Sequence, residues 1–88
     1  KIALLSDDDF LDVICNKINY NEIIEAIKSL SDKYRDVLYY HFVLELSIPQ
    51  TAKSLNQTLS TTKQRLVRGK KLLLNLLGLK GDENNGNK

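Results

Sequence analysis

The sequence predicts an all-α domain of four or five helices that ends in a helix-turn-helix. Apolar residues recur at helical spacing along most of the chain, and residues that favour helix N-termini precede these runs. The last two runs are separated by about four residues and the second of them is basic, which is typical of a helix-turn-helix. A chain of 88 residues is long enough for one small domain with a single modest core.

The first 20 residues leave two interpretations open, an N-terminal helix or an acidic linker. Ser6 can cap a helix that runs through Ile18, and the three aspartates that follow Ser6 favour a helix N-terminus. One side of this helix would carry Phe10, Ile14 (or Val13) and Ile18. The alternative is a linker rich in acidic residues.

Two helices are predicted next, over residues 22–30 and from residue 32 to about residue 44. Asn21 can cap the first, and Ser31 can cap the second, whose first turn contains the negative charge of Asp32. The buried stripe of the first helix is Ile23, Ile24, Ile27 and Leu30. In the second helix, the residues at helical spacing are Tyr34, Val37, Leu38, His41 and Phe42.

The start of a fourth, short helix is marked by a capping signal. Ser47 stands at the cap, Pro49 lies in the first turn, and Gln50 follows the serine by three residues, as in a capping box. The helix is expected to end near Leu55. Asn56 then tolerates the left-handed conformation with which many helices end.

A tight turn over residues 57–59 leads to the last predicted helix. We expect Ser60 to cap this helix, which runs to about Leu77 and stops at Gly78. The helical domain therefore spans residues 21–79. The tail of residues 80–88 is rich in glycine, asparagine and charge, and we expect it to be disordered.

The net charge of +2 hides a strong asymmetry between the two halves of the chain. Residues 1–46 hold nine acidic and five basic residues, a net charge of −4. Residues 47–80 hold seven basic residues and no acidic residue, a net charge of +7, and residues 81–88 add −1. An acid-free basic stretch of this length points to a polyanionic partner.

The last helix has two different faces when its residues are placed at 100° intervals. The inward face collects Thr62, Leu66, Gly69, Leu73 and Leu76. The outward face collects Ser60, Gln64, Val67, Arg68 and Lys71, with Thr61 and Lys63 on its flanks. Arg65 lies near the inward face, and its long stem can carry its charge outward. Gly69 lets a neighbouring helix approach closely, at about 1 kcal/mol of helix propensity.

The outward face suits the major groove of DNA. Its N-terminal half offers short hydrogen-bonding groups for base edges, and its C-terminal half offers cations for phosphates. No acidic residue lies four positions away to pair with these cations, as the solvated helix of an ordinary bundle would usually provide. A protein-interaction module whose basic helix meets an acidic partner is the alternative.

Residues 30–73, LSDKYRDVLYYHFVLELSIPQTAKSLNQTLSTTKQRLVRGKKLL, resemble the C-terminal DNA-binding domain, region 4, of bacterial sigma-70 family sigma factors. The similarity is greatest to the extracytoplasmic-function type. The positions that match the family pattern are Leu30, Arg35, Val37, Ser47, Ala52, Leu55, Thr61, Lys63, Arg65, Leu66 and Arg68.

The resemblance implies recognition of the minus-35 promoter element by double-stranded DNA binding, contact with the flap of core RNA polymerase, and masking by an anti-sigma factor. By position, the residues that would contact bases are Ser60, Thr61, Lys63 and Gln64. Those that would contact phosphates are Lys53, Arg65, Arg68 and Lys71. A regulator that resembles region 4 without serving polymerase is a second alternative.

Several positions depart from the family pattern. Glu45 stands where the turn before the fourth helix often has glycine, and Thr51 stands at an apolar position of that helix. Thr62 replaces a core valine, and Ser60 stands where glycine is frequent. These departures affect the promoter sequence that would be recognised more than the fold.

No enzyme, cofactor or metal site is expected. His41 is the only histidine and is interpreted as a helix-packing residue, because a metal site needs several ligands. Cys15, the only cysteine, is interpreted as a small buried apolar group. A single cysteine and the absence of a long apolar run indicate a reducing, cytoplasmic location with no membrane span. The chain begins with lysine, so we expect it to be a fragment of a longer protein.

The apolar segment of residues 72–79 allows two interpretations. A helix end that is apolar almost all round is usually buried on several sides, here under the first helices of the same domain. The alternative is a docking patch for the polymerase flap or for an anti-sigma factor.

Overall fold

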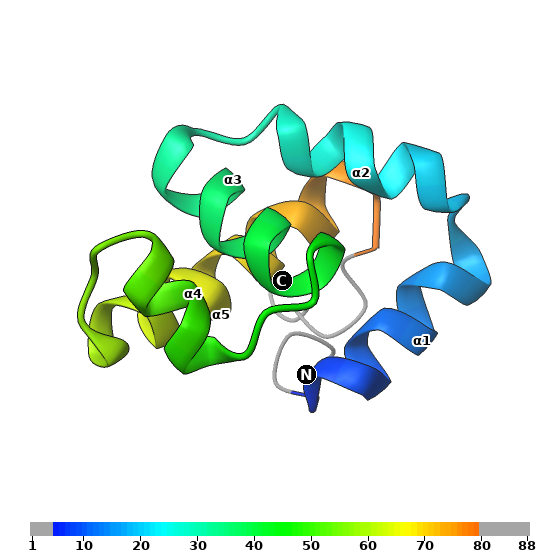
Figure 1. The fold of residues 1–88 in the computed structure, drawn as a ribbon. Helices are drawn as coiled ribbons and strands as arrows, with labels where there is room; N and C mark the ends of the chain where they lie inside the picture. The colour runs from blue at the N-terminus through cyan, green and yellow to red at the C-terminus, as the bar shows by residue number, and fades with distance from the viewer. Residues whose placement is uncertain (1–4, 80–88) are drawn as a thin grey trace, which may run out of the picture.

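The computed structural model describes residues 5–79, and all regular structure in that part of the chain is helical (Figure 1). The helices are α1 (Asp7–Lys17), α2 (Tyr20–Lys28), α3 (Asp32–Leu38), the π-helical segment η2 (Tyr39–Val43), α4 (Ile48–Ser54) and α5 (Leu59–Leu76). The predicted all-α fold is confirmed. The tail predicted to be disordered, residues 80–88, lies outside the described residues.

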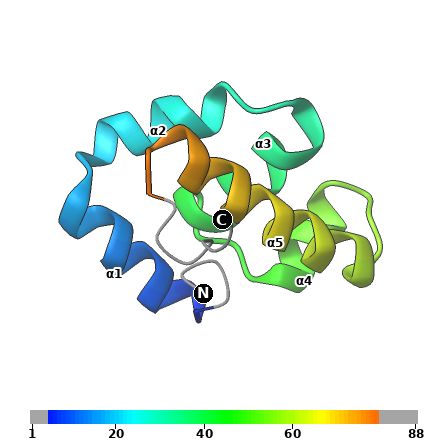
Figure 2. The same ribbon diagram turned by 180° about the vertical axis from the view of Figure 1, so that it is seen from behind.

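The helices surround one core, to which α5 contributes its inward face. α5 packs along α3 and against α4 at its N-terminal half, while α2 lies beside its C-terminal half (Figures 1 and 2). The largest cluster of buried residues is Phe10, Ile14, Ile23, Ile27, Val37, Leu38, Phe42, Leu66, Leu73 and Leu74. Helices from both ends of the described chain therefore share this core.

Residues 7–17 form the helix α1, as the first of the two interpretations of this segment expects. The Asp9 N–H donates to Ser6 Oγ at 3.3 Å, so serine caps α1 as the sequence predicts. Phe10 and Ile14 are fully buried, which settles the open choice between Ile14 and Val13. Cys15 is exposed, contrary to the prediction, because it follows Ile14 by 100° around the helix and points away from the core.

The boundaries of α2 differ from the prediction. Asn19, not Asn21, is the N-cap, and its Oδ1 accepts a hydrogen bond from the Asn21 N–H at 2.8 Å. Ile18 is extended (φ −129°, ψ 140°), so α1 has already ended and the chain can cap a new helix at once. At the other end, α2 stops at Lys28, whereas the prediction extended it to residue 30.

The helix that begins at Asp32 changes from an α-helix to a π-helix after Leu38. Ser31 occupies the N-cap position, but its side chain makes no capping hydrogen bond. The final turn is a π-helix, in which the Leu44 N–H donates to the Tyr39 carbonyl at 3.0 Å. Glu45 then adopts a left-handed conformation (φ 60°) at the position where the family pattern favours glycine. This conformation costs a non-glycine residue about 1 kcal/mol.

Helix α4 has the predicted capping box. The Gln50 N–H donates to Ser47 Oγ at 3.1 Å, and the Ser47 N–H donates to Gln50 Oε1 at 2.9 Å. The helix buries Ala52 and Thr51. Thr51 Oγ1 is buried and has no hydrogen-bond partner among the described residues. The threonine at an apolar family position is therefore a source of instability.

We expect Thr51→Val to raise the free energy of unfolding by about 1 kcal/mol, because it removes an unsatisfied buried hydroxyl while keeping the branched shape. Thermal unfolding would show this as a rise of about 4–8 °C. Thr62→Val is the matched control, because Thr62 Oγ1 lies 2.9 Å from the Thr58 carbonyl oxygen, to which it can donate. A loss of stability in both variants would contradict the prediction.

The buried face of α5 differs from the predicted one at its C-terminal half. Gly69 is buried as predicted, and a Cβ atom at this position would lie 3.2 Å from two atoms of the Leu38 side chain, Cγ and Cδ1. Leu76, predicted to face inward, is 55% exposed, whereas Lys70 and Leu74 are buried. The buried residues in this half lie at different positions around the helix from the predicted ones, because α5 packs against α2 as well as α3.

Residues 72–79 are divided between core and surface. Leu73 and Leu74 are buried, and Leu77 and Leu79 pack against the core. Leu72 and Leu76 are exposed. The expected burial on several sides is therefore only partly correct, and an exposed apolar pair, one helical turn apart, remains at this end of α5.

Candidate nucleic-acid interface

The pair α4 and α5 forms the predicted helix-turn-helix. Leu55 ends α4, and Asn56 has φ 56°, which confirms the left-handed conformation expected from the sequence. The Gln57 N–H donates to the Ala52 carbonyl at 2.8 Å, so the turn folds back on the end of α4. The turn is therefore fixed by its own hydrogen bonds, and it sets the position at which α5 begins.

Helix α5 begins one residue before the predicted cap. Thr58, not Ser60, is the N-cap, and its Oγ1 accepts from the Thr61 N–H at 3.1 Å. Thr62 Oγ1 also lies 3.0 Å from Gln57 Oε1, which ties the helix to the turn. These turn contacts favour the earlier start, so Ser60 lies in the first turn of α5 and remains exposed.

The earlier start adds Leu59 to α5, whereas the sequence predicts this residue in the turn. Leu59 is the first residue of α5 and is 45% exposed at its tip. It lines a shallow hollow on the outer face together with Ser60, Lys63, Gln64, Val67, Arg68 and Lys71. Three of the four predicted base-contacting residues, Ser60, Lys63 and Gln64, therefore share one face with Leu59. Two of the predicted phosphate-contacting residues, Arg68 and Lys71, lie on the same face.

The predicted contacts Thr61 and Arg65 lie on a second edge of the same helix. They line a smaller hollow with Gln64 and Arg68, and α3 completes this hollow with Lys33 and Tyr34. Gln64 and Arg68 therefore line both hollows. Sequence reasoning missed Lys33, because no local pattern links it to α5; the packing of α3 against α5 brings it there.

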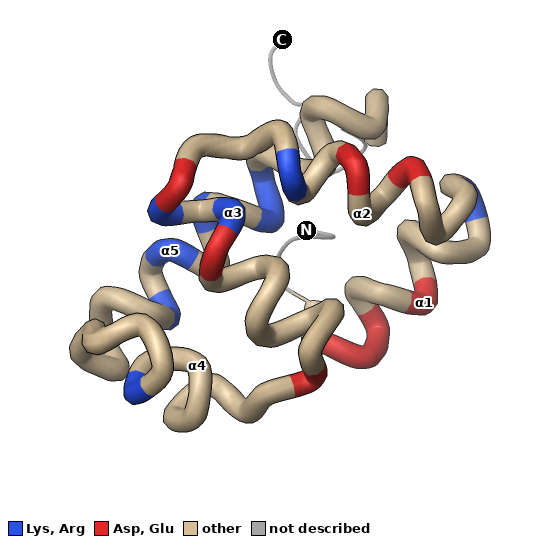
Figure 3. The backbone as a smooth tube through the Cα atoms, turned by 45° about the horizontal axis from the view of Figure 1, so that its top comes forward, with Lys and Arg blue, Asp and Glu red and all other residues tan. Residues whose placement is uncertain are grey.

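The cations of the helix-turn-helix carry no ion pair within residues 5–79, apart from Lys70. Lys53 is exposed on α4 and lines neither hollow. Figure 3 shows basic residues along α4 and α5, whereas the acidic residues lie on α1, α2, α3 and the turn before α4. By contrast, Arg35 on α3 lies 3.1 Å from Asp32 and 3.0 Å from Asp36. The outward cations of α5 are thus available to an external anion.

A protein-family model described as Sigma-70, region 4, matches residues 20–73. The chain belongs to the sigma-70 region 4 family. The match begins at the start of α2 and ends within α5, so it includes the whole helix-turn-helix and leaves α1 outside. Region 4 is a family of DNA-binding domains that act in promoter recognition with RNA polymerase, and it is not an enzyme family.

Two further searches identified no relative of this region 4 domain: neither a curated protein nor a solved structure matches it. Within residues 5–79, no helix is both long enough and apolar enough to cross a membrane. The same described residues contain no group of three or more histidine, cysteine, aspartate or glutamate side chains placed to hold a metal ion.

Proposed function

We propose that the chain binds the minus-35 promoter element as the C-terminal domain of an alternative sigma factor of the extracytoplasmic-function type. In this role it positions bacterial RNA polymerase for initiation, and the polymerase performs the chemistry. The observation that carries the proposal is the outer face of α5, the second helix of the helix-turn-helix, which is exposed and free of acidic residues.

In this mechanism the tip of α5 enters the major groove. Ser60, Thr61, Lys63 and Gln64 contact base edges, where hydroxyl, amide and ammonium groups can distinguish base pairs. Leu59 offers an apolar contact for a thymine methyl group, and its apolar side chain is larger than the methyl group of Thr61 at the same tip.

Phosphate contacts fix the register of the helix and supply most of the affinity. Arg65, Arg68 and Lys71 contact phosphates from α5, and Lys53 reaches the backbone from α4. Lys33 extends this phosphate-binding edge onto α3, because it lines the same hollow as Arg65 and Arg68.

The exposed pair Leu72 and Leu76 supports a contact with polymerase or with an anti-sigma factor. Both side chains lie on α5 beyond the proposed DNA-contacting residues, with Leu72 beside Tyr34, Arg68 and Lys71. An apolar pair with a cationic border fits a protein surface better than a phosphate backbone.

We expect Arg68→Ala to weaken binding to all duplex DNA by a similar factor and to reduce the slope of log K against log salt by about one. The reason is that a phosphate contact releases a counterion but reads no base. The measurement is a salt titration of binding to a promoter duplex and to a scrambled duplex. Lys17→Ala, at the end of α1, is the control of equal charge.

Two results would overturn the proposed function. An Arg68→Ala variant that binds DNA with an unchanged salt slope would favour the protein-interaction module. A dimer that requires a palindromic site would favour the regulator that does not serve polymerase. A measurement of molecular size with and without core polymerase tests whether the chain binds polymerase, which is the remaining element of the proposal.

A further inference from the structure

Helix α1 is attached to the domain mainly by side chains. It lies outside the residues that match region 4, and it lies at the end of the fold opposite α4 in Figures 1 and 2. Phe10 and Ile14 enter the core from α1, and the Phe10 ring centroid lies 5.6 Å from that of Phe42 in η2. A helix held in this way can open locally without unfolding the rest of the domain.

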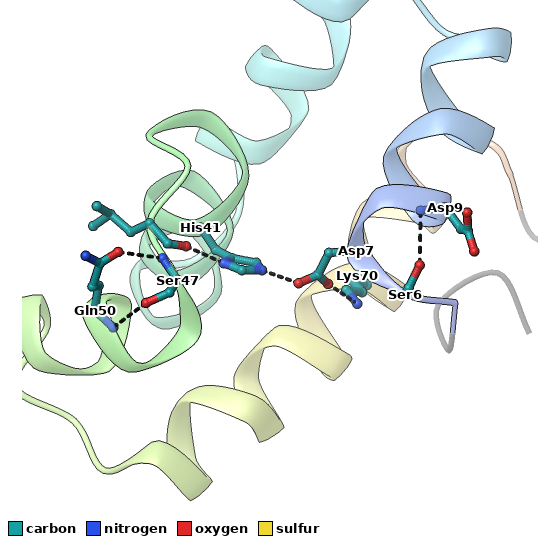
Figure 4. Close-up of polar contacts among 8 residues, drawn as sticks. Ser6, Asp7, Asp9, His41, Ser47, Gln50 and Lys70 are labelled. Carbon is teal, nitrogen blue, oxygen red and sulfur yellow. Dashed lines mark hydrogen bonds and ion pairs between the residues drawn. The ribbon is translucent and has the colours of Figure 1, made fainter.

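One carboxylate of α1 joins three helices. Asp7 Oδ1 lies 2.9 Å from Nζ of Lys70 on α5, and Asp7 Oδ2 accepts a hydrogen bond from Nε2 of His41 on η2 (Figure 4). Lys70 is only 7% exposed, and its Nζ lies 5.3 Å from the Phe10 ring centroid. Removal of Asp7 would leave this buried ammonium without its carboxylate, which is costly.

Both ring nitrogens of His41 face oxygen acceptors. Nδ1 lies 2.6 Å from the Leu46 carbonyl oxygen, and Nε2 faces the Asp7 carboxylate. A carbonyl and an ionised carboxylate only accept, so both contacts are hydrogen bonds only when the ring carries two protons. A neutral imidazole has one N–H and must give up one of the two contacts.

We propose that Asp7, His41 and Lys70 form a proton-dependent clasp that fastens α1 to the domain when His41 is protonated. Loss of the His41 proton removes one hydrogen bond and leaves a lone pair facing either the carbonyl or the carboxylate. The clasp then weakens, and α1 opens more often when His41 is neutral than when it is protonated.

Protonation of the Asp7 carboxylate weakens the clasp at low pH. Partial burial alone would raise the pKa of Asp7, but hydrogen bonds and charges from His41 and Lys70 outweigh it and hold that pKa below its usual value. The carboxylate therefore stabilises the fold above its unfolded-state pKa, and this contribution is lost as pH falls through the lower folded-state value. Asp8 and Glu45 line the same hollow as Asp7 and His41 and add negative charge there.

Hydrogen exchange of the α1 amides, measured by NMR on the full chain, tests the clasp. Between about pH 5.5 and 8.5 we expect the protection factors of α1, corrected for intrinsic exchange, to fall about tenfold while those of α5 change little. Asp7→Asn should lower α1 protection by about tenfold at the lower pH. Asp9→Asn is the matched control, since it removes the same charge from the first turn of α1 and Asp9 does not line the hollow that holds Asp7 and His41.

His41→Gln should abolish the pH dependence of α1 protection, because glutamine does not titrate in this range. The clasp is wrong if α1 protection in the unsubstituted chain is independent of pH. It is equally wrong if Asp7→Asn and Asp9→Asn lower α1 protection by the same factor, because that result would indicate a helix-dipole effect alone.

Discussion

Replacement of Phe10 by alanine is expected to lower the free energy of unfolding by about 3–5 kcal/mol. The side chain is fully buried, and it contacts the aromatic ring of Phe42 and the ammonium of Lys70. Its removal leaves a cavity where α1, η2 and α5 meet. A domain of this size has a total stability of about 4–13 kcal/mol, so the loss is a large fraction of it.

Urea denaturation followed by circular dichroism measures this loss, and Val13→Ala is the control on the same helix. Val13 is only partly buried, so its truncation should cost much less. Equal losses in the two variants would mean that α1 does not share the core of the domain. A Phe10→Ala variant that retains DNA binding at low temperature would show that α1 stabilises the helix-turn-helix without contacting DNA.

Gln64→Ala, alone or with Lys63→Ala, is expected to reduce discrimination between the preferred DNA site and its single-base variants by about 1–3 kcal/mol. Gln64 has the central position on the outer face, because it lines both hollows of α5. Its amide can donate and accept at the same base, and alanine can do neither. Binding of the Gln64→Ala single variant to non-specific DNA should change little, because Gln64 carries no charge.

Binding to a pool of randomised duplexes, followed by sequencing, measures this discrimination. Asn75→Ala is the matched control, since it removes an exposed amide from α5 about 16 Å further along the helix. The predicted role of Gln64 would be contradicted if the two variants gave the same sequence preference as the unsubstituted chain. It would also be contradicted if Asn75→Ala relaxed the preference as much as Gln64→Ala.

The candidate interface was largely predictable because its signals are local. A capping box depends on residues three positions apart, and the left-handed turn depends on a single asparagine, so Ser47, Gln50 and Asn56 specify the first half of the helix-turn-helix. The outer face of α5 follows from helical periodicity, which places exposed residues correctly even when the start of the helix is misplaced. The shift of the N-cap from Ser60 to Thr58 therefore altered the tip of α5 by adding Leu59 and left the rest of the face unchanged.

By itself, the sequence determined the helical class of the fold, the order of the helices, the capping box and the acid-free outer face of α5, because each depends on residues close together in the chain. Tertiary structure alone decided that α1 joins the core, that Lys70 is buried against Asp7, and that Lys33 lies beside α5. These features depend on contacts between residues far apart in sequence. Each of these groups could contact several different residues, and only the packing of all the helices determines which residue becomes its neighbour.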